Sequence, residues 1–92
     1  MLFAIFCTDK DDYLDVRLDN RPQHVEHLKS IGDQLVFAGP TLADDGETMN
    51  GSLIVVDMAD RAAVDAFADA DPYKQAGLFE SAVIRPWNKV LG

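Results

Sequence analysis

The chain has 92 residues, of which 48% are hydrophobic and 26% charged, so we expect a single folded domain over residues 1–92, and a disordered chain is excluded. Its formal net charge of −8 and pI near 4.4 disfavour binding to nucleic acid or an anionic membrane, because both carry the same sign of charge. No apolar stretch approaches the roughly 20 residues of a membrane-spanning helix, the single Cys7 excludes an intrachain disulfide, and the start lacks the basic segment of a signal peptide, so we expect a cytoplasmic protein.

The first third of the chain predicts a strand followed by a broken helix. Residues 2–8 form a short apolar run typical of a strand, and three aspartates within residues 9–12 offer side chains to cap a helix. Apolar residues then recur at helical spacing through residues 13–32. Pro22 interrupts this pattern, and a proline inside a helix costs about 3 kcal/mol. We therefore expect one helical piece to end near Asp19 and a second to carry Pro22 in its first turn.

The rest of the chain predicts three more strands and one more helix. Residues 34–39 and 52–58 are apolar strand segments, joined by a polar stretch over 40–50 that is long for so small a domain and is therefore a candidate functional loop. A helix is expected from an Asp60 cap through Ala70. Residues 78–87 predict the last strand.

The order of elements is βαββαβ, which predicts an α+β ferredoxin-like fold: a four-stranded antiparallel sheet with two helices on one face. A sheet with one wet face should alternate polar and apolar residues, yet residues 2–7 and 53–56 are apolar at every position. A large exposed apolar surface marks an interface. We therefore expect the open face to pair with a second copy of the chain, forming a homodimeric α+β barrel.

The two histidines of the chain lie three residues apart on the predicted helix. A helical wheel places His24 beside the apolar face and His27 about 60° further toward solvent, so His24 should be half-buried and His27 mostly wet. A metal site is disfavoured because it needs three or four ligands, and the chain offers no further histidine. Two readings of His24 remain open: a histidine bonded to a backbone carbonyl, or an acid/base group that needs a nearby carboxylate.

A second candidate is the sequence Asp71-Pro72-Tyr73. It suits a helical turn in which the aspartate is the N-cap, and it also suits a carboxylate that faces the space between helix and sheet. Two arginines of the first helix, Arg17 and Arg21, could hold a substrate carboxylate through paired hydrogen bonds. They could equally pair with the abundant aspartates.

Two glycine-containing pairs at strand ends form a third candidate. Gly39-Pro40 ends the second predicted strand, and Gly51-Ser52 begins the third. Glycine allows a backbone to approach a ligand closely, and it is also an ordinary strand terminator. The residues alone do not separate these readings.

Taken together, six short motifs resemble the pattern of the YciI-like (YCII-related) family, over essentially the whole chain. They are Arg21-Pro-Gln-His24, Gly39-Pro40, Gly51-Ser52, Asp71-Pro72-Tyr73, Ala76-Gly77 and Pro86-Trp87. The resemblance implies a dimeric α+β barrel related to muconolactone isomerase-like enzymes. It also implies a pocket in which His24 and Asp71 form an acid/base pair, with dehydrochlorinase-type elimination on a muconate-like acid as the attached activity. The family pattern asks for no histidine at His27.

Two functional hypotheses result. In the first, the protein is a cofactor-free lyase or isomerase in which His24 moves a proton on a small carboxylated metabolite and Asp71 orients the imidazole. The substrate-binding candidates are then Arg17, Arg21, Gly39, Pro40, Gly51, Ser52 and Tyr73. In the second, the same dimer is a non-catalytic module that binds a small ligand or assists a larger enzyme, because a fold alone does not decide function.

Overall fold

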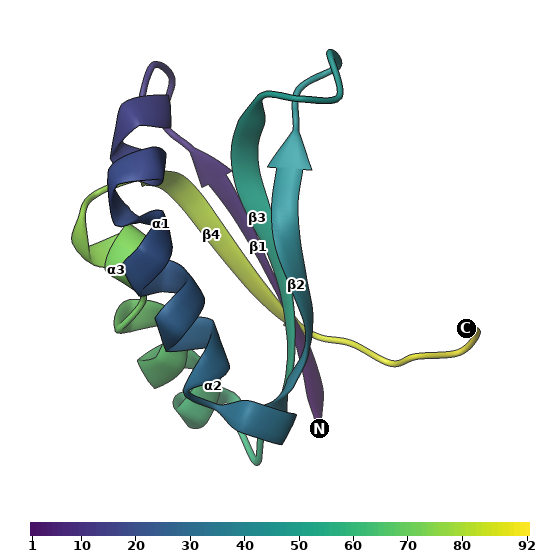
Figure 1. Ribbon diagram of the computed structural model, residues 1–92. Coiled ribbons are helices and arrows are strands. Elements are labelled where there is room, and N and C mark those ends of the chain that lie inside the picture. The colour runs from purple at the N-terminus through teal and green to yellow at the C-terminus, as the bar shows by residue number, and fades with distance from the viewer.

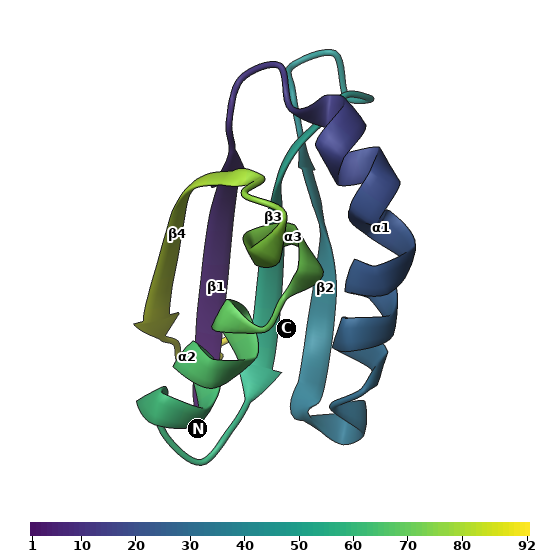
Figure 2. The ribbon, with the colours of Figure 1, turned by 90° about the vertical axis from the view of Figure 1, so that its left-hand side faces the viewer.

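The computed structural model covers residues 1–92 and has two layers, a four-stranded antiparallel sheet and a layer of helices on one of its faces (Figures 1 and 2). The strands are β1 (Leu2–Asp9), β2 (Leu35–Leu42), β3 (Met49–Asp57) and β4 (Phe79–Pro86), in the spatial order β2-β3-β1-β4. The helices are α1 (Leu14–Lys29), α2 (Arg61–Asp69) and the short α3 (Pro72–Gln75), with a 3-10 turn, η1 (Gly32–Gln34), before β2. The predicted ferredoxin-like α+β fold is confirmed.

The core lies between the sheet and the helices. Phe3, Ile5 and Cys7 alternate along β1 with side chains on the open face, and all three are buried against the helical layer. Ile5 pairs with Ile54 of β3, which is also buried. α2 contributes Val64 and Phe67 to the same cluster, and Asp60 caps this helix, as predicted, by accepting a hydrogen bond of 2.9 Å from the Ala63 amide.

The first helix is continuous, so the predicted break before Pro22 is wrong. The inner face of α1 is buried on both sides of the proline, with Arg17 before it and His24 and Leu28 after it. Packing of this face against the sheet holds both halves in line, as tertiary contacts commonly do against local propensity. Pro22 and Leu18 lie on the exposed side, so the Leu18 carbonyl that lacks its usual partner remains open to water.

The start of α1 also differs from prediction. Tyr13 occupies the N-cap position, and no side chain caps the helix. Asp9, one of the predicted caps, is instead the last residue of β1 and is buried in an ion pair with Arg17. Asp9 therefore joins β1 to α1 by pairing with the side chain of Arg17, the fourth residue of the helix, and does not cap the first backbone amides.

The loop predicted over residues 40–50 is shorter than expected, because residues 40–42 and 49–50 belong to strands. β2 and β3 form a hairpin whose connecting segment is only 43–48. Asp45 closes that segment by accepting hydrogen bonds from the amides of Glu47 and Thr48 and from the Thr48 hydroxyl. These bonds lower the pKa of Asp45 to about 2. The cross-strand bond from the Thr41 hydroxyl to Asn50, at 2.8 Å, shows why polar residues here can still be strand.

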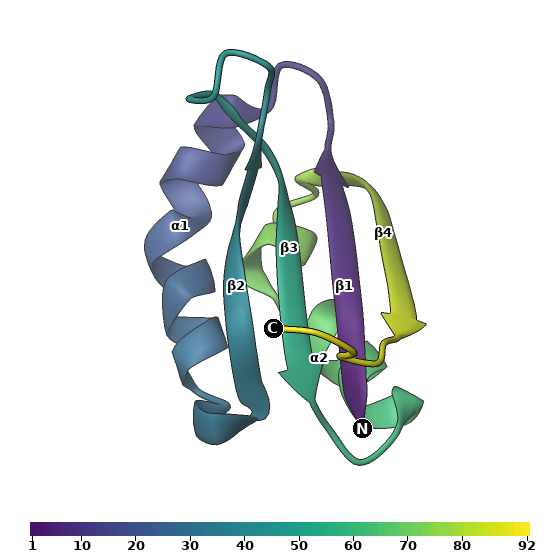
Figure 3. The same cartoon turned by 90° about the vertical axis from the view of Figure 1, so that its right-hand side faces the viewer.

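The open face of the sheet is apolar, as predicted, and the C-terminal segment after β4 crosses it (Figure 3). Phe6, Phe37 and Val83 remain 49%, 48% and 44% exposed. Trp87 of the C-terminal segment packs edge-on against Phe37, with ring centres 6.5 Å apart. None of the helices has the length and apolar character needed to cross a membrane.

Candidate active site

A cleft of about 280 Å³ lies between α1 and the β2–β3 side of the sheet. Seven of the nine predicted site residues line it: Arg17, Arg21, His24, Gly39, Pro40, Ser52 and Tyr73. An eighth, Asp71, bonds to His24 and lines a neighbouring cavity. The ninth, Gly51, lies outside the lining.

His24 and Asp71 form a buried pair. The Nδ1 atom of His24 lies 2.9 Å from Oδ1 and 3.0 Å from Oδ2 of Asp71, and the two residues are 7% and 3% exposed. An ionised carboxylate only accepts hydrogen bonds, so Nδ1 of His24 carries the proton and donates a hydrogen bond to Asp71. His24 is thus more buried than the half-buried position that the wheel predicts.

The position of Asp71 unites the two readings of the Asp71-Pro72-Tyr73 sequence. Asp71 is the N-cap of α3, and its Oδ1 accepts a hydrogen bond of 2.9 Å from the Tyr73 amide. The cap fixes the carboxylate in place while it receives the His24 N–H. A capping aspartate and an aspartate that orients an imidazole are therefore the same residue here.

The second ring nitrogen of His24 is left free. Nε2 has no hydrogen-bond partner within the protein, and no fully buried side-chain nitrogen or oxygen lacks one. Nε2 must therefore be accessible from outside the protein, and the open space that His24 lines is the cleft. With its proton on Nδ1, the neutral imidazole presents a lone pair at Nε2.

Tyr73 connects the histidine with an arginine. Its ring stacks on that of His24 with centres 3.9 Å apart and planes at 17°, and the Arg17 guanidinium carbon lies 4.6 Å from its centre. Burial raises the pKa of the Tyr73 phenol, although the charges of Arg17 and Arg21 oppose this. The hydroxyl therefore keeps its proton and can donate a hydrogen bond.

Arg17 is held by the protein itself. Its Nε lies 2.7 Å from Oδ2 of Asp9, and its Nη2 lies 2.9 Å from Oδ1 of Asp9 and 3.0 Å from the Ser52 hydroxyl. Burial favours loss of the Arg17 charge, but the bonds to Asp9 and its charge outweigh this and raise the Arg17 pKa above its usual value. Arg21 also lines the cleft and forms no ion pair, so it is the cation that remains free for an anionic ligand.

Sequence reasoning missed the role of Asp9, although the strand pattern contained the signal. Asp9 follows Phe3, Ile5 and Cys7 at alternate positions, and alternation places all four on the side of the sheet that faces the helices. A charged residue on that side must be paired. Its partner, Arg17, lies eight residues further along the chain.

The helical wheel predicts that His27 is mostly exposed to solvent, and this prediction is wrong. His27 is partly buried, its Nε2 lies 2.9 Å from the Phe67 carbonyl oxygen, and its ring stacks on Phe67 with centres 4.5 Å apart. The packing of α2 beside this turn of α1 supplies both contacts. A bond to a backbone carbonyl, which we considered for His24, is thus the arrangement of His27.

The two glycines differ in what their environment requires. A Cβ atom on Gly51 would overlap the Cys7 carbonyl and the Thr41 hydroxyl, so glycine is needed there for strand packing. A Cβ on Gly39 would meet nothing within 4 Å, and its backbone lines the cleft. Cys7 is no candidate nucleophile, because burial and the charge of Asp71 raise the pKa of its thiol to about 12.

Residues 1–88 match the family described as YCII-related domain. The chain belongs to this family. It is 37% identical to Protein YciI of Escherichia coli O6:H1 over 98 residues, which cover 99% of this chain and 100% of that protein. Protein YciI of Shigella flexneri matches equally, and an uncharacterized protein of Haemophilus influenzae is 32% identical with the same coverage. The predicted family resemblance is confirmed.

Among solved structures, a dehydrochlorinase is similar in fold to this YCII-related chain. The 5-chloro-2-hydroxyhydroquinone dehydrochlorinase TftG of Burkholderia phenoliruptrix, in complex with 2,5-dihydroxybenzoquinone, superposes with a TM-score of 0.88 at 32% identity, covering 96% of this chain and 94% of that one. An antibiotic biosynthesis monooxygenase superposes with a TM-score of 0.57 at 15% identity, covering 99% and 100%, which shows a shared fold alone.

Proposed function

We propose that this protein is a small enzyme of the lyase or isomerase type that moves a proton with His24 and Asp71. The observation that carries the proposal is the geometry of this pair. Both oxygens of a buried carboxylate lie within 3.0 Å of His24 Nδ1, which leaves Nε2 free beside a cleft. An imidazole held in one tautomer by a carboxylate is the arrangement expected of a general base.

In the proposed reaction, His24 Nε2 removes a proton from the substrate. The resulting imidazolium is stabilised by Asp71, and a positioned acid/base group of this kind contributes about 10²–10⁴-fold to a rate. Arg21, which has no ion pair, binds the negative charge of the substrate. The Tyr73 hydroxyl, which keeps its proton, donates to an oxygen where charge develops. Arg17 is already neutralised by Asp9, so we assign it to holding Tyr73.

The likeness to TftG supports a small oxygenated ring as substrate. For a chlorinated trihydroxybenzene, His24 takes a hydroxyl proton and returns a proton to the ring carbon that bears chlorine. Loss of a second hydroxyl proton then expels chloride. The net change is loss of HCl, which leaves a hydroxyquinone and needs neither oxidant nor reductant.

The test is chloride release from 5-chloro-2-hydroxyhydroquinone, followed by a panel of chlorinated and carboxylated rings. We expect Asp71→Asn to lower kcat/KM by about 10²–10⁴-fold, because asparagine preserves the cap to Tyr73 but cannot stabilise a charged imidazole. Asp69→Asn is the matched control, since the Asp69 side chain is exposed and its only polar partner is Lys74, at 3.7 Å. Full activity in Asp71→Asn would contradict the proposed mechanism.

The exposed apolar residues of the open sheet face support a dimer, and a dimer fits a second candidate function, a non-catalytic binding or accessory module, as well as it fits the enzyme. Phe6 and Val83 are cross-strand neighbours on that face and are about half exposed. We propose that this face pairs with a second copy of the chain. Phe6→Glu should then give a monomer by analytical ultracentrifugation, whereas Leu18→Glu, on the helical layer and equally exposed, should not. A dimer that binds panel compounds without converting any of them would favour this candidate over the enzyme.

A further inference from the structure

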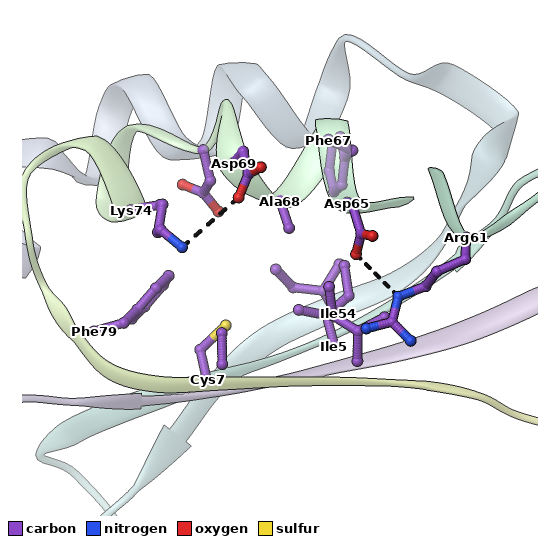
Figure 4. Close-up of a pocket in the computed structure, with 13 residues that line it drawn as sticks. Ile5, Cys7, Ile54, Arg61, Asp65, Phe67, Ala68, Asp69, Lys74 and Phe79 are labelled. Carbon is purple, nitrogen blue, oxygen red and sulfur yellow. Dashed lines mark hydrogen bonds and ion pairs between the residues drawn. The ribbon is translucent and has the colours of Figure 1, made fainter. Parts of the chain in front are cut away.

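A second cavity, of about 200 Å³, lies between α2 and the strands β1 and β4 (Figure 4). It is a neighbour of the cleft described above, because Ile54 lines both spaces. Asp71 lines the second cavity while it bonds to His24, which lines the cleft. The two spaces therefore meet at the His24–Asp71 pair, and the proposed reaction makes no use of the second one.

The inner wall of this cavity is apolar and its mouth is charged. Ile5, Ile54, Phe79 and the Cys7 thiol form the wall (Figure 4). The charged residues at the mouth are all exposed and stand in two pairs. Arg61 lies 2.9 Å from Asp65, and Lys74 lies 3.7 Å from Asp69.

Charge decides which ligands suit this cavity. The two cations at its mouth are each matched by an aspartate, so neither offers a free positive charge to a ligand. Asp71 adds a buried negative group to the wall. An anionic ligand would meet this carboxylate in an apolar space, where repulsion between like charges is poorly screened. A neutral ligand meets no such penalty.

Size and hydrogen bonding narrow the class further. A dry cavity of about 150 Å³ lined by aliphatic and aromatic side chains holds a benzene ring, so this slightly larger space fits a ring with one small substituent. The Asp71 carboxylate accepts only the His24 ring N–H and the Tyr73 amide. Two carboxylate oxygens offer about four acceptor positions, and these two donors make three contacts because the His24 N–H lies against both oxygens, so at least one position remains for a further donor.

We infer that the cavity under α2 is a binding site for a small neutral aromatic alcohol of the phenol class. The ring lies against Ile5, Ile54 and Phe79, and the hydroxyl donates a hydrogen bond to Asp71. The occupant thereby shares one carboxylate with His24 from the opposite side. This inference needs no turnover, and it stands whether or not the proposed reaction is correct.

The experiment titrates the intact protein with phenol, anisole and benzoate at neutral pH, where a phenol with a pKa near 10 is uncharged. Calorimetry gives the affinities, and NMR follows the ring signals of His24. We expect phenol to bind and to move the His24 signals. Anisole lacks the donor and should bind about tenfold or more weakly, because a hydrogen bond to a charged group is lost. Benzoate should show no binding in this cavity.

Two alanines provide matched variants. Ala82 of β4 lines the cavity and Ala38 of β2 lines the cleft. Ala82→Leu should abolish phenol binding by filling the space, and Ala38→Leu should leave it intact. Ala68→Leu fills the cavity from α2 and replaces Ala82→Leu if that variant is unfolded by circular dichroism. Loss of phenol binding in Ala38→Leu alone, equal binding of anisole, or no phenol binding to the unchanged protein would overturn the inference.

Discussion

His24 and His27 lie on neighbouring turns of α1 and have the same kind of contact on one face, yet their polar partners differ. Each imidazole stacks on an aromatic ring, His24 on Tyr73 and His27 on Phe67. His24 bonds through Nδ1 to a carboxylate, and His27 bonds through Nε2 to the Phe67 carbonyl. Stacking holds both rings, but only a carboxylate can stabilise a positive imidazole strongly.

The difference extends beyond the rings themselves. The His24 side of the helix carries a buried ion pair, Arg17 with Asp9, which touches the same Tyr73 ring. On the His27 side there is no such ion pair. The His27 ring contacts only the ring and the backbone carbonyl of Phe67 in α2. Two histidines three residues apart therefore separate into one position suited to proton transfer and one that docks two helices together.

The largest contrast is expected in turnover. His24→Ala removes the proposed base and should lower kcat/KM for any substrate found by about 10²–10⁴-fold. His27→Ala leaves the cleft unchanged and should retain most activity. The comparison fails if both variants lose activity equally while their unfolding curves match that of the unchanged protein, because the two histidines would then not differ in role.

The next contrast concerns stability at the charged side of the helix. Asp9→Ala leaves the Arg17 charge buried and unpaired, which should lower the free energy of unfolding by about 3–5 kcal/mol. Arg17 is 2% exposed, so water compensates poorly for the lost carboxylate. Asp65→Ala breaks the exposed pair with Arg61 and should cost only about 0.3–0.5 kcal/mol. Urea unfolding measures both, and similar values for the two would show that the buried pair is not what stabilises this side.

A smaller effect is expected at the docking histidine. His27→Phe keeps an aromatic ring beside Phe67 but removes the hydrogen bond to the Phe67 carbonyl, so it should lower the free energy of unfolding by about 1 kcal/mol. Chloride release should not change. A loss of several kcal/mol in urea unfolding would mean that the His27 bond supports the packing of α2 far more than a partly buried bond should.

Much of the fold follows from local pattern. The apolar run over residues 2–8 and the Asp60 cap predict β1 and the start of α2 correctly, because each depends on neighbours in the chain. The break predicted at Pro22 fails because burial of His24 and Leu28 beyond it outweighs the local cost. The loop predicted over residues 40–50 is present but too long, because Thr41 and Asn50 belong to the strands and bond to each other across the hairpin.

The candidate site was less predictable from pattern alone. His24 and Asp71 are 47 residues apart in the chain, and no periodicity brings them together, so their pairing was implied only by the family resemblance. The bond from His27 to Phe67 likewise spans 40 residues and depends on where α2 packs. Of the residues around the site, only the burial of Asp9 follows from the sequence alone, because alternation along the strand fixes its side of the sheet.

The smallest expected difference between His24 and His27 is in their tautomers, and it can be measured without any substitution. An Asp71 carboxylate accepts, so neutral His24 must carry its proton on Nδ1. The Phe67 carbonyl also accepts, so neutral His27 must carry its proton on Nε2. Nitrogen-15 NMR at alkaline pH distinguishes these forms, and the two histidines should show opposite tautomers. If His24 carried its proton on Nε2, the atom beside the cleft would be a donor, and it could not serve as the base while the ring is neutral.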